Sequence, residues 1–333
     1  MSDRRATRKD VAELAGVSET IVSYVVNQNR YVKEEKRQRV LAAMEELNYR
    51  PNWFARALKG KSCKHIVLLI DRIRTEAFGE LVSDIETCSG DLGYMVSVSI
   101  ISNTEEYVNR IIDWQIDGVI ISSINFSEKY IQKLVDKGIP VILLQNRSYK
   151  HVKGAARINT GLYEGTRKSV HYLLQSGCKK VIYVDRVSVH GHFSGPSDFR
   201  YAGYIDEMKQ NNCEPRIISH CATPGDLQER LIAEMAQNPF DGVFGRNDEI
   251  ASIVMNTLIR KGYHVPNDVS IIGLDNTTYS KISFPTLSTL CQERGKIART
   301  AIQMIEEFDS RAPAQTVHFE PELIIRESVR RRK

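Results

Sequence analysis

The sequence predicts an all-α helix-turn-helix head with a hinge helix, joined to an α/β body of two lobes with doubly wound parallel sheets. The first 50 residues contain three helical patterns and no strand pattern, whereas apolar runs alternate with amphipathic stretches from residue 64 onward. Charge divides at the same place. Residues 1–62 hold 13 Lys or Arg and 8 Asp or Glu, and the rest of the chain holds equal numbers of each kind. A basic head on a near-neutral body indicates a polyanionic partner for the head.

The composition excludes several classes of protein. A chain of 333 residues with 42% hydrophobic and 26% charged residues is typical of a globular protein with more than one domain. No apolar run reaches the roughly 18–20 residues of a membrane helix, and the beginning, MSDRRATRKD, lacks the apolar segment of a secretory signal. We therefore expect a cytoplasmic protein with no membrane partner. Six cysteines form no CxxC pair, so we expect free thiols, no metal and no cofactor.

The head is expected to span residues 1–49. Thr7 can cap a helix that begins at Arg8, with Asp10 closing a capping box. Gly16 can form the tight turn that follows, and Ser18 can cap a second helix. A third helix is expected over about 34–47. The expected apolar faces of the three helices are Val11, Ala12, Leu14 and Ala15, then Ile21, Val22, Val25 and Val26, then Val40, Leu41, Met44 and Leu47.

Two short helices joined by a glycine-containing turn form a helix-turn-helix unit, whose second helix meets base edges in the DNA major groove. Glu19 can accept a hydrogen bond from a cytosine amino group, Thr20 can contact a base or a methyl group, and Tyr24 can contact bases or backbone. The alternative for the same pattern is a small bundle that docks onto protein. Basic residues placed to meet phosphates are Lys33, Lys36, Arg37 and Arg39.

The segment RPNWFARALKGK, residues 50–61, favours DNA binding. Pro51 ends the preceding element, and residues 52–59 are long enough for only one or two turns of helix. A helix that short is marginal in isolation, so we expect it to form against DNA and a second copy of the chain. Leu58 would then act as an apolar wedge in the minor groove.

The head and hinge of this chain resemble those of the LacI/GalR (lactose-repressor) family, in the stretches TRKDVAELAGVSETIVSYVVN and VLAAMEELNYRPNWFARALKGK. The hinge spans residues 50–62 of this sequence. The resemblance places Glu19, Thr20 and Tyr24 at base-reading positions, and Ala55 and Leu58 at hinge contacts with the minor groove. Lys33 departs from the family, in which a capping Ser is common at that position. The full set of predicted DNA-contacting residues is Thr7, Lys9, Ser18, Glu19, Thr20, Ser23, Tyr24, Asn27, Lys36, Arg37, Asn52, Ala55 and Leu58.

The body, residues 63–333, reads as strands that are buried on both faces and separated by helices. The predicted strands are HIVLLI, YMVSVSI, DGVIIS, PVILLQ, KVIYVD, GVFG and VSIIGLD, with helices at 76–92, 105–115, 128–137, 161–176 and 248–262. These are enough strands for two sheets and a cleft. We expect an N-lobe of about 63–160 plus 292–320, and a C-lobe of about 161–290 plus the C-terminal end.

Polar residues recur directly after these strands, where doubly wound folds bind ligands. Taken singly, each is more simply explained as a helix cap or turn residue, and only their recurrence indicates a site. They are Asp71, Ser122, Gln145, Asn146, Asp185, Asn247, Asp248, Asp275 and Gln292.

The body also resembles the effector-binding domain of the same family, in SDFRYAGY, FDGVFGRNDEIA, VSIIGLDNTTYSKISFPTLSTLCQ and the closing ELIIRESV. That domain has the two-lobed fold of periplasmic sugar-binding proteins. The implied effector contacts are Asp71, Gln145, Arg200, Asn247, Asp275 and Gln292. An arginine fork with amides and carboxylates suits hydroxyl or anionic groups, so the expected effector is a sugar or sugar derivative. Gln145, where many sugar-sensing relatives carry Asp, and Arg246 are departures that favour a phosphorylated, acidic or larger glycoside.

We therefore predict a ligand-responsive repressor that is not an enzyme and binds a near-palindromic operator as a homodimer. A sugar-processing enzyme with a DNA-binding head would need a phosphate-binding loop or a nucleophile elbow, and the chain contains no GxxxxGK[ST], GxGxxG or GxSxG. A sugar-binding protein would account for the body and leave the head unexplained. The ending ESVRRRK has no heptad tail, which favours a dimer over a tetramer.

Overall fold

A computed structural model describes residues 6–27, 30–50, 62–72 and 75–330. The chain divides into two compact units, residues 1–63 and 64–333, called the head and the body below. Among the described residues, no helix combines the length and the apolar character that crossing a bilayer requires. The predicted hinge helix at 52–59 lies outside the described residues.

The head consists of α1 (Arg8–Ala15), α2 (Glu19–Asn27) and α3 (Glu34–Glu46). The predicted capping box is present: the Thr7 Oγ1 accepts from the Asp10 backbone N–H, and an Asp10 carboxylate oxygen accepts from the Thr7 N–H at 2.6 Å. Gly16 follows α1 with φ +62°, the left-handed conformation that the tight turn requires. These two caps fix where α1 begins and ends.

The head's core is formed by Val11, Val22 and Val40, one from each helix and all fully buried. Leu14 and Leu41 were predicted to be core residues, but 47% and 41% of their surfaces are exposed. Leu41 lies roughly 100° around α3 from Val40. The buried residues of α3 are Val40 and the small Ala43, which is 3% exposed.

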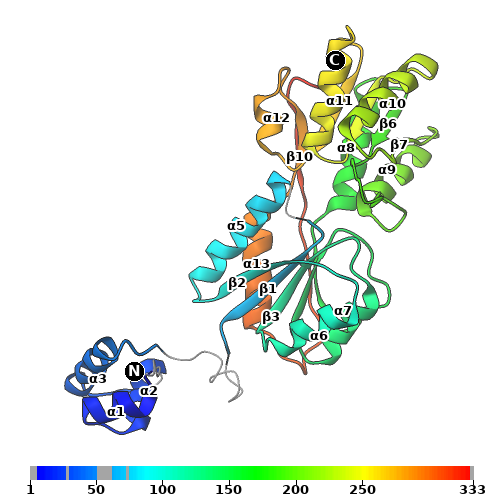
Figure 1. Ribbon diagram of the computed structural model, residues 1–333. Coiled ribbons are helices and arrows are strands. Elements are labelled where there is room, and N and C mark those ends of the chain that lie inside the picture. The colour runs from blue at the N-terminus through cyan, green and yellow to red at the C-terminus, as the bar shows by residue number, and fades with distance from the viewer. Residues whose placement is uncertain (1–5, 28–29, 51–61, 73–74, 331–333) are drawn as a thin grey trace. The chain divides into compact units, whose positions relative to one another are not determined.

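The N-lobe contains a six-stranded sheet in the order β11-β5-β4-β3-β1-β2, with all neighbouring strands parallel. Alternate residues of the central strands point to opposite faces: Val67 packs against α6 and α7, and Leu68 against α5 and α13. Figure 1 shows these two helical layers on either side of the sheet. Its elements are β1 (His65–Ile70), α5 (Glu76–Gly90), β2 (Met95–Ile100), α6 (Glu105–Asp113), β3 (Gly118–Ser122), α7 (Glu128–Asp136), β4 (Val141–Gln145), β5 (Ala156–Asn159), α13 (Arg294–Glu306) and β11 (Thr316–His318).

The C-lobe repeats this design, with the sheet order β12-β10-β9-β8-β6-β7 and only β12 antiparallel to its neighbour. Its two faces are covered by α8 with α9 and by α10 with α11. The doubly wound fold predicted from the sequence is therefore confirmed. Its elements are α8 (Leu162–Gln175), β6 (Val181–Val184), α9 (Phe199–Gln210), β7 (Arg216–Ile218), α10 (Pro224–Gln237), β8 (Gly242–Gly245), α11 (Asp248–Arg260), β9 (Ser270–Leu274), α12 (Thr278–Ile282), β10 (Ser288–Cys291) and β12 (Glu322–Ile324).

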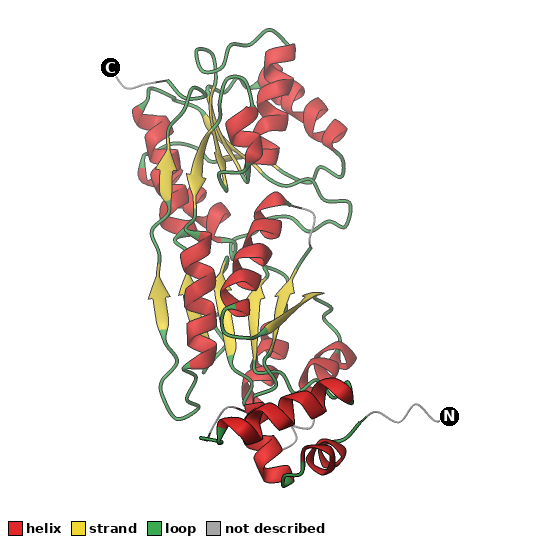
Figure 2. Ribbon diagram, turned by 90° about the vertical axis from the view of Figure 1, so that its left-hand side faces the viewer, coloured by secondary structure: helices red, strands yellow, loops and turns green. Residues whose placement is uncertain are grey.

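The chain passes between the lobes three times, after β5, after β10 and after β11 (Figure 2). The first and third passages pack directly on each other at Gly161. This residue has φ +73°, and a Cβ added there would lie 2.4 Å from the carbonyl oxygen of Phe319 and 2.3 Å from Pro321 Cδ. Only glycine fits this junction without displacing backbone.

We expect Gly161→Ala to lower the free energy of unfolding by about 2–4 kcal/mol, because overpacking adds to the cost of a left-handed backbone. Urea denaturation measures the loss. Gly138→Ala is the matched control: its φ is +76° but nothing lies within 4 Å of the added Cβ, so only about 1–2 kcal/mol is expected. Equal losses in the two variants would contradict close packing at the junction.

Candidate functional site

The first candidate surface is the outward face of α2 in the head. Val22 and Val25 are buried, whereas Glu19 and Thr20 are exposed. Tyr24, one turn further along the helix, is half-buried. The helical period therefore separates a packing side from a polar side that can contact another molecule.

Arg30 lies against Tyr24 and was not predicted from the sequence. Its Nη1 donates to the Tyr24 hydroxyl at 3.4 Å, and its guanidinium lies 5.3 Å from the ring centroid. Arg30 comes after the end of α2 in the chain, and its cation–π contact helps to fix the position of the Tyr24 ring. No helical spacing links the two positions, so the pattern carried no signal for the pair.

The other predicted DNA-contacting residues of the head are at its surface. Ser18 is exposed and its Oγ accepts from the Ile21 N–H at 3.4 Å, while Thr7 is engaged in its capping box. Lys9 and Lys36 are exposed, Ser23 and Arg37 are half-buried, and Lys33 and Arg39 are exposed beside them. The side chain of Asn27 and all of Asn52, Ala55 and Leu58 lie outside what the structure describes.

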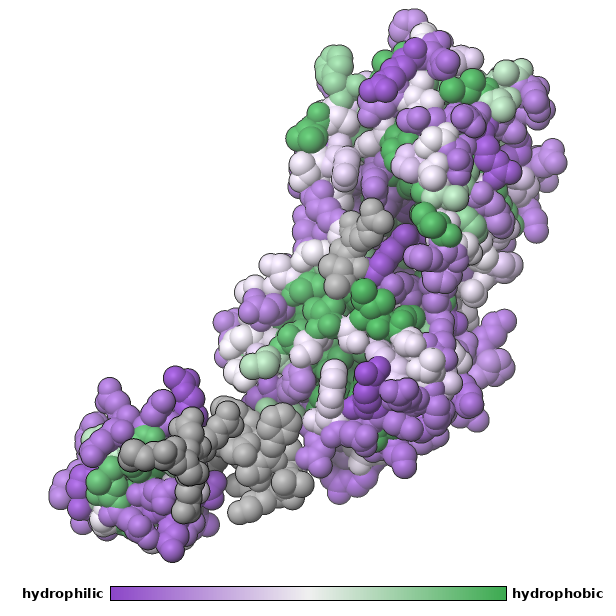
Figure 3. Space-filling model, viewed as in Figure 1, coloured by the Kyte–Doolittle hydropathy of each residue, from purple (hydrophilic) through white to green (hydrophobic). Residues whose placement is uncertain are grey.

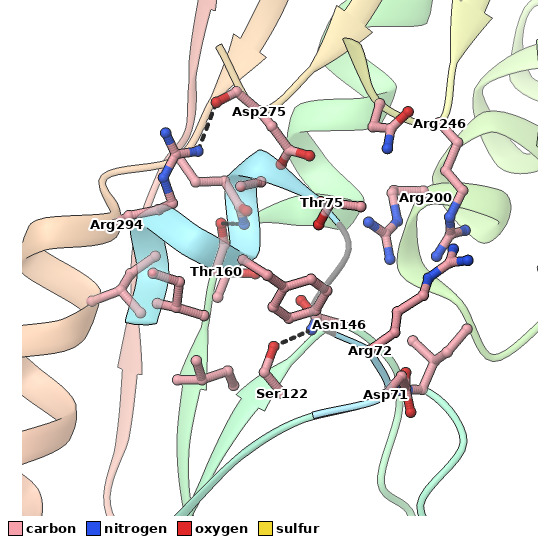
Figure 4. A pocket seen from close by; sticks show the side chains of 18 of the residues that line it. Asp71, Arg72, Thr75, Ser122, Asn146, Thr160, Arg200, Arg246, Asp275 and Arg294 are labelled. Atoms are coloured by element: carbon pink, nitrogen blue, oxygen red, sulfur yellow. Dashed lines mark hydrogen bonds between the residues drawn. The ribbon is translucent and has the colours of Figure 1, made fainter. Parts of the chain in front are cut away.

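The second candidate site is a cavity between the two lobes of the body, with about 860 Å³ of space between its walls, part of it open to solvent. Figure 4 shows polar side chains from both lobes converging on it. Its described lining residues are Asp71, Arg72, Thr75, Ala77, Phe78, Leu81, Ser122, Ile124, Leu144, Asn146, Thr160, Arg186, Arg200, Arg246, Asn247, Asp275, Gln292, Arg294 and Ile297.

Five of the six predicted effector contacts line this cavity: Asp71, Arg200, Asn247, Asp275 and Gln292. Gln145 is not among the residues that line the cavity, because successive residues of a strand point to opposite faces of the sheet. Leu144 and Asn146 point toward the cavity instead, and the Asn146 Nδ2 donates to Ser122 Oγ at 3.1 Å.

Asp71 is held in place by the segment that follows the neighbouring strand β3, and Asn247 by the helix that it begins. The Asp71 carboxylate accepts from Ser123 Oγ at 2.6 Å and from the Ile124 N–H at 2.8 Å. Asn247 caps α11, since its Oδ1 accepts from the Ile250 N–H at 2.9 Å. This cap directs the Asn247 Nδ2, a donor, away from the helix and leaves it for a ligand.

Asp275 follows β9 with φ +105°, a conformation that costs free energy for any residue with a Cβ. Its backbone N–H donates to the Leu290 carbonyl at 2.8 Å, and its own carbonyl accepts from Arg294 at 2.6 Å. These bonds hold the strained residue at the cavity wall. Burial raises the pKa of its carboxyl group, and Arg200 and Arg294 oppose the rise.

A buried ion-pair cluster forms the C-lobe wall. Arg246 donates to one oxygen of Asp198 at 2.7 Å, and Arg200 Nε lies 3.1 Å from the other. Asp198 is 1% exposed and Arg246 4% exposed, so these charges depend on each other. Arg200 and Arg246 hold the pKa of Asp198 far below its usual range, against the opposing effect of burial. The cluster keeps the Arg200 fork at the cavity wall.

Three lining arginines were missed by the sequence analysis: Arg72, Arg186 and Arg294. Arg72 and Arg186 are each one residue further than the strand-end aspartates Asp71 and Asp185, and Arg294 begins α13. Both Arg72 and Arg186 stand just after predicted strands, so a search for basic residues at strand ends, beside acidic and amide ones, identifies them. Among the described residues, no group of three or more His, Cys, Asp or Glu side chains could hold a metal ion.

Comparisons with known proteins match both the head and the body of this chain. The family described as "Bacterial regulatory proteins, lacI family" matches residues 7–52, and the "Periplasmic binding protein-like domain" matches residues 170–329. The HTH-type transcriptional repressor PurR of Actinobacillus pleuropneumoniae serotype 3 (strain JL03) is 30% identical over 341 residues, covering 98% of each chain.

Two solved structures share the fold. The lac repressor dimer bound to operator and the anti-inducer ONPF superposes with a TM-score of 0.80 at 24% identity, covering 98% of this chain and 99% of that one. A complex of the transcriptional regulator CelR with cellobiose has a TM-score of 0.66 at 19% identity, covering 97% and 100%. At these identities the likeness establishes the fold alone.

Proposed function

The chain belongs to the lacI family of bacterial regulatory proteins, and from that premise we propose that it is a transcriptional repressor controlled by a small effector. It would bind a near-palindromic operator in the cytoplasm as a homodimer. The observation that carries the proposal is that one chain combines an exposed polar face on a helix-turn-helix with a polar cavity between two lobes. The PurR relative is named as a transcriptional repressor and not as an enzyme.

In the proposed DNA complex, α2 lies in the major groove with Glu19, Thr20 and Tyr24 toward the bases. The exposed Lys9 and Lys36 would neutralise phosphates on either side. The base contacts would determine which operator sequence is bound, and the basic residues would supply most of the binding affinity.

We propose a sugar derivative as the effector. The cavity offers donors and acceptors on both lobes, such as Asn247, Asp275 and Gln292, with apolar walls at Phe78 and Leu81. Sugars present this combination of hydroxyl edges and apolar faces. The CelR structure that shares the fold holds cellobiose. Such a polar site rejects a wrong ligand because unpaired buried groups are costly.

The effector would act through the closure of the two lobes. Glu76 on α5 accepts from the Thr278 N–H at 2.8 Å and from its hydroxyl at 2.7 Å, and the Asn146 carbonyl accepts from the Phe199 N–H at 3.1 Å. These contacts bridge the lobes on either side of the cavity. A ligand that binds one closure angle better than another shifts the balance between them, and through it the spacing of the two heads.

The homodimer would form along the face that carries α5, β2 and α12. Ile282 and Phe284 are 75% and 87% exposed, and Met95 on the edge strand β2 is 70% exposed. Figure 3 shows apolar side chains gathered over α5 and the N-lobe, with further ones at α12. Exposed apolar area of this extent is a common sign of an interface.

We expect Ile282→Lys to weaken dimerisation at least about tenfold, since a charge in the core of an interface is costly. Analytical ultracentrifugation of the full chain measures the change. Val189→Lys is the matched control, because Val189 is also 75% exposed but lies in the loop after β6. A dimer equally stable in both variants, or a stable tetramer, would refute this interface.

The proposed function is tested by selecting bound duplexes from a random DNA pool with the purified protein at moderate salt. Enrichment of one near-palindrome supports a dimeric operator reader. The selection is repeated with sugar derivatives added, because a corepressor can be required for binding. Absence of enrichment under all of these conditions would overturn sequence-specific repression.

A further inference from the structure

Arg186 is a buried cation without a partner. It is 6% exposed and lines the cavity. Its Nε has no hydrogen-bond acceptor, and no carboxylate among the described residues lies within ion-pair distance of its guanidinium. Structures rarely leave such a group unpaired, because removing a charge from water costs several kcal/mol unless an opposite charge or acceptors replace the solvent.

The neighbouring arginines of the cavity differ in this respect. Arg200 and Arg246 share the carboxylate of Asp198. Arg294 pairs with Glu80 at the other end of the cavity. Asp198 is thus already engaged by two guanidinium groups, and it influences Arg186 only as a weaker, more distant charge. Arg186 is therefore the guanidinium whose charge the described residues leave uncompensated.

The positive charges gather at one end of the cavity. Figure 4 shows Arg72, Arg200 and Arg246 together, with Asp275 and Arg294 on the other side of the cavity. Burial and the nearby charges of Arg246, Arg200 and Arg72 together lower the pKa of Arg186 to about 9. A group with that pKa still carries its proton at neutral pH. Its charge is consequently present where the ligand binds.

We propose that the cavity takes a small polyhydroxyl ligand bearing an oxyanion, a phosphate ester or a carboxylate, and that Arg186 pairs with that group. The guanidinium fork matches either oxyanion in a bidentate geometry. The oxyanion lies at the Arg72 and Arg200 end, where the arginines that surround Arg186 gather. The hydroxyl groups then face Asn247 and Asp275. This inference rests on the proposed function, because it specifies the effector of that same cavity.

The test is thermal unfolding of the full chain and of Arg186→Met, with inorganic phosphate replacing chloride at constant ionic strength. Phosphate should raise the Tm of the unmodified protein saturably, by about 2–4 °C or more at concentrations well above its Kd. The variant should show no such rise. Without phosphate, Arg186→Met should itself have the higher Tm, because it removes an uncompensated buried charge. Arg216→Met, which loses an ion pair with Glu234 outside the cavity, should keep the phosphate response.

Each other outcome overturns the proposal. No specific effect of phosphate on the unmodified protein would exclude an oxyanion site. Equal stabilisation of Arg186→Met would place phosphate elsewhere. A lower Tm of the variant in chloride would show that Arg186 is compensated by the protein itself.

Glucose 6-phosphate, glucuronate and glucose then distinguish the two oxyanions. A larger Tm rise with glucose 6-phosphate assigns a phosphate ester, and a larger rise with glucuronate assigns a carboxylate. A rise with glucose that is equal to both and unchanged in Arg186→Met refutes the inference. Operator selection with the same two proteins separates this failure from failure of the proposed function: a protein that enriches a palindrome but ignores oxyanions is a repressor with a neutral effector.

Discussion

Replacing Arg246 by methionine is expected to lower the free energy of unfolding by about 3–5 kcal/mol, the usual cost of removing one partner of a buried ion pair. Asp198 would keep Arg200, but its second oxygen would lose the 2.7 Å bond to Arg246. Asp185, whose carboxylate lies 3.6 Å from the same guanidinium, would also lose a countercharge. Urea denaturation followed by circular dichroism measures the loss.

Arg216→Met is the control for this variant. Arg216 pairs with Glu234, and the two side chains are 21% and 31% exposed, so solvent screens their interaction. A loss of only about 0–1 kcal/mol is expected for a pair of this kind. Similar losses in the two variants would show that burial of the Asp198 cluster contributes nothing special to stability.

The same cluster predicts a pH dependence. Because the pKa of Asp198 is lower in the folded protein than in the unfolded chain, its contribution to stability is complete above the unfolded value of about 3.9 and decreases as pH falls below it. Arg246→Met raises the folded pKa toward that value. The variant should therefore lose less stability than the unmodified protein between about pH 4 and pH 2, as acid titrations of the unfolding free energy will test.

Replacing Tyr24 by alanine is expected to weaken binding to the selected operator by about 5- to 150-fold, the range for a base contact worth about 1–3 kcal/mol. Binding to random DNA should change much less. Tyr24→Phe keeps the ring over which Arg30 lies and removes only the hydroxyl that accepts from Arg30. Fluorescence anisotropy on both duplexes separates the two contributions. An equal loss on operator and random DNA would contradict base reading by Tyr24.

Lys36→Ala provides the opposite pattern as a control. Lys36 is exposed on α3, and a phosphate contact carries no sequence information. The variant should weaken operator and random DNA alike and reduce the slope of log affinity against log salt by about one. A change confined to the operator would mean that Lys36 contacts bases.

Much of the fold could be read from local patterns. The runs HIVLLI and VSIIGLD predicted strands β1 and β9, because strands covered on both faces are apolar without interruption. The capping residues Thr7 and Gly16 predicted both ends of α1. Short edge elements such as β11 and β12 were missed, because three residues with one half-covered face carry too little periodic signal.

The effector site, too, could be predicted from the sequence only in part. By itself, the sequence determined that polar residues follow the strands, since that order along the chain is local, and five of the six predicted effector contacts lie in the cavity. Whether Gln145 or Asn146 faces the cavity depends on the strand's exact end, which pairing with β5 decides.

Only the tertiary structure decided which charges are compensated. Asp198 pairs with Arg200 and Arg246, while Arg186 remains without a partner. Arg186 and Arg246 are 60 positions apart and come together because β6 and β8 are neighbouring parallel strands whose ends meet at the same edge of the sheet. Composition records only how many charges there are, whereas pairing depends on distances of a few ångströms in a region that excludes water.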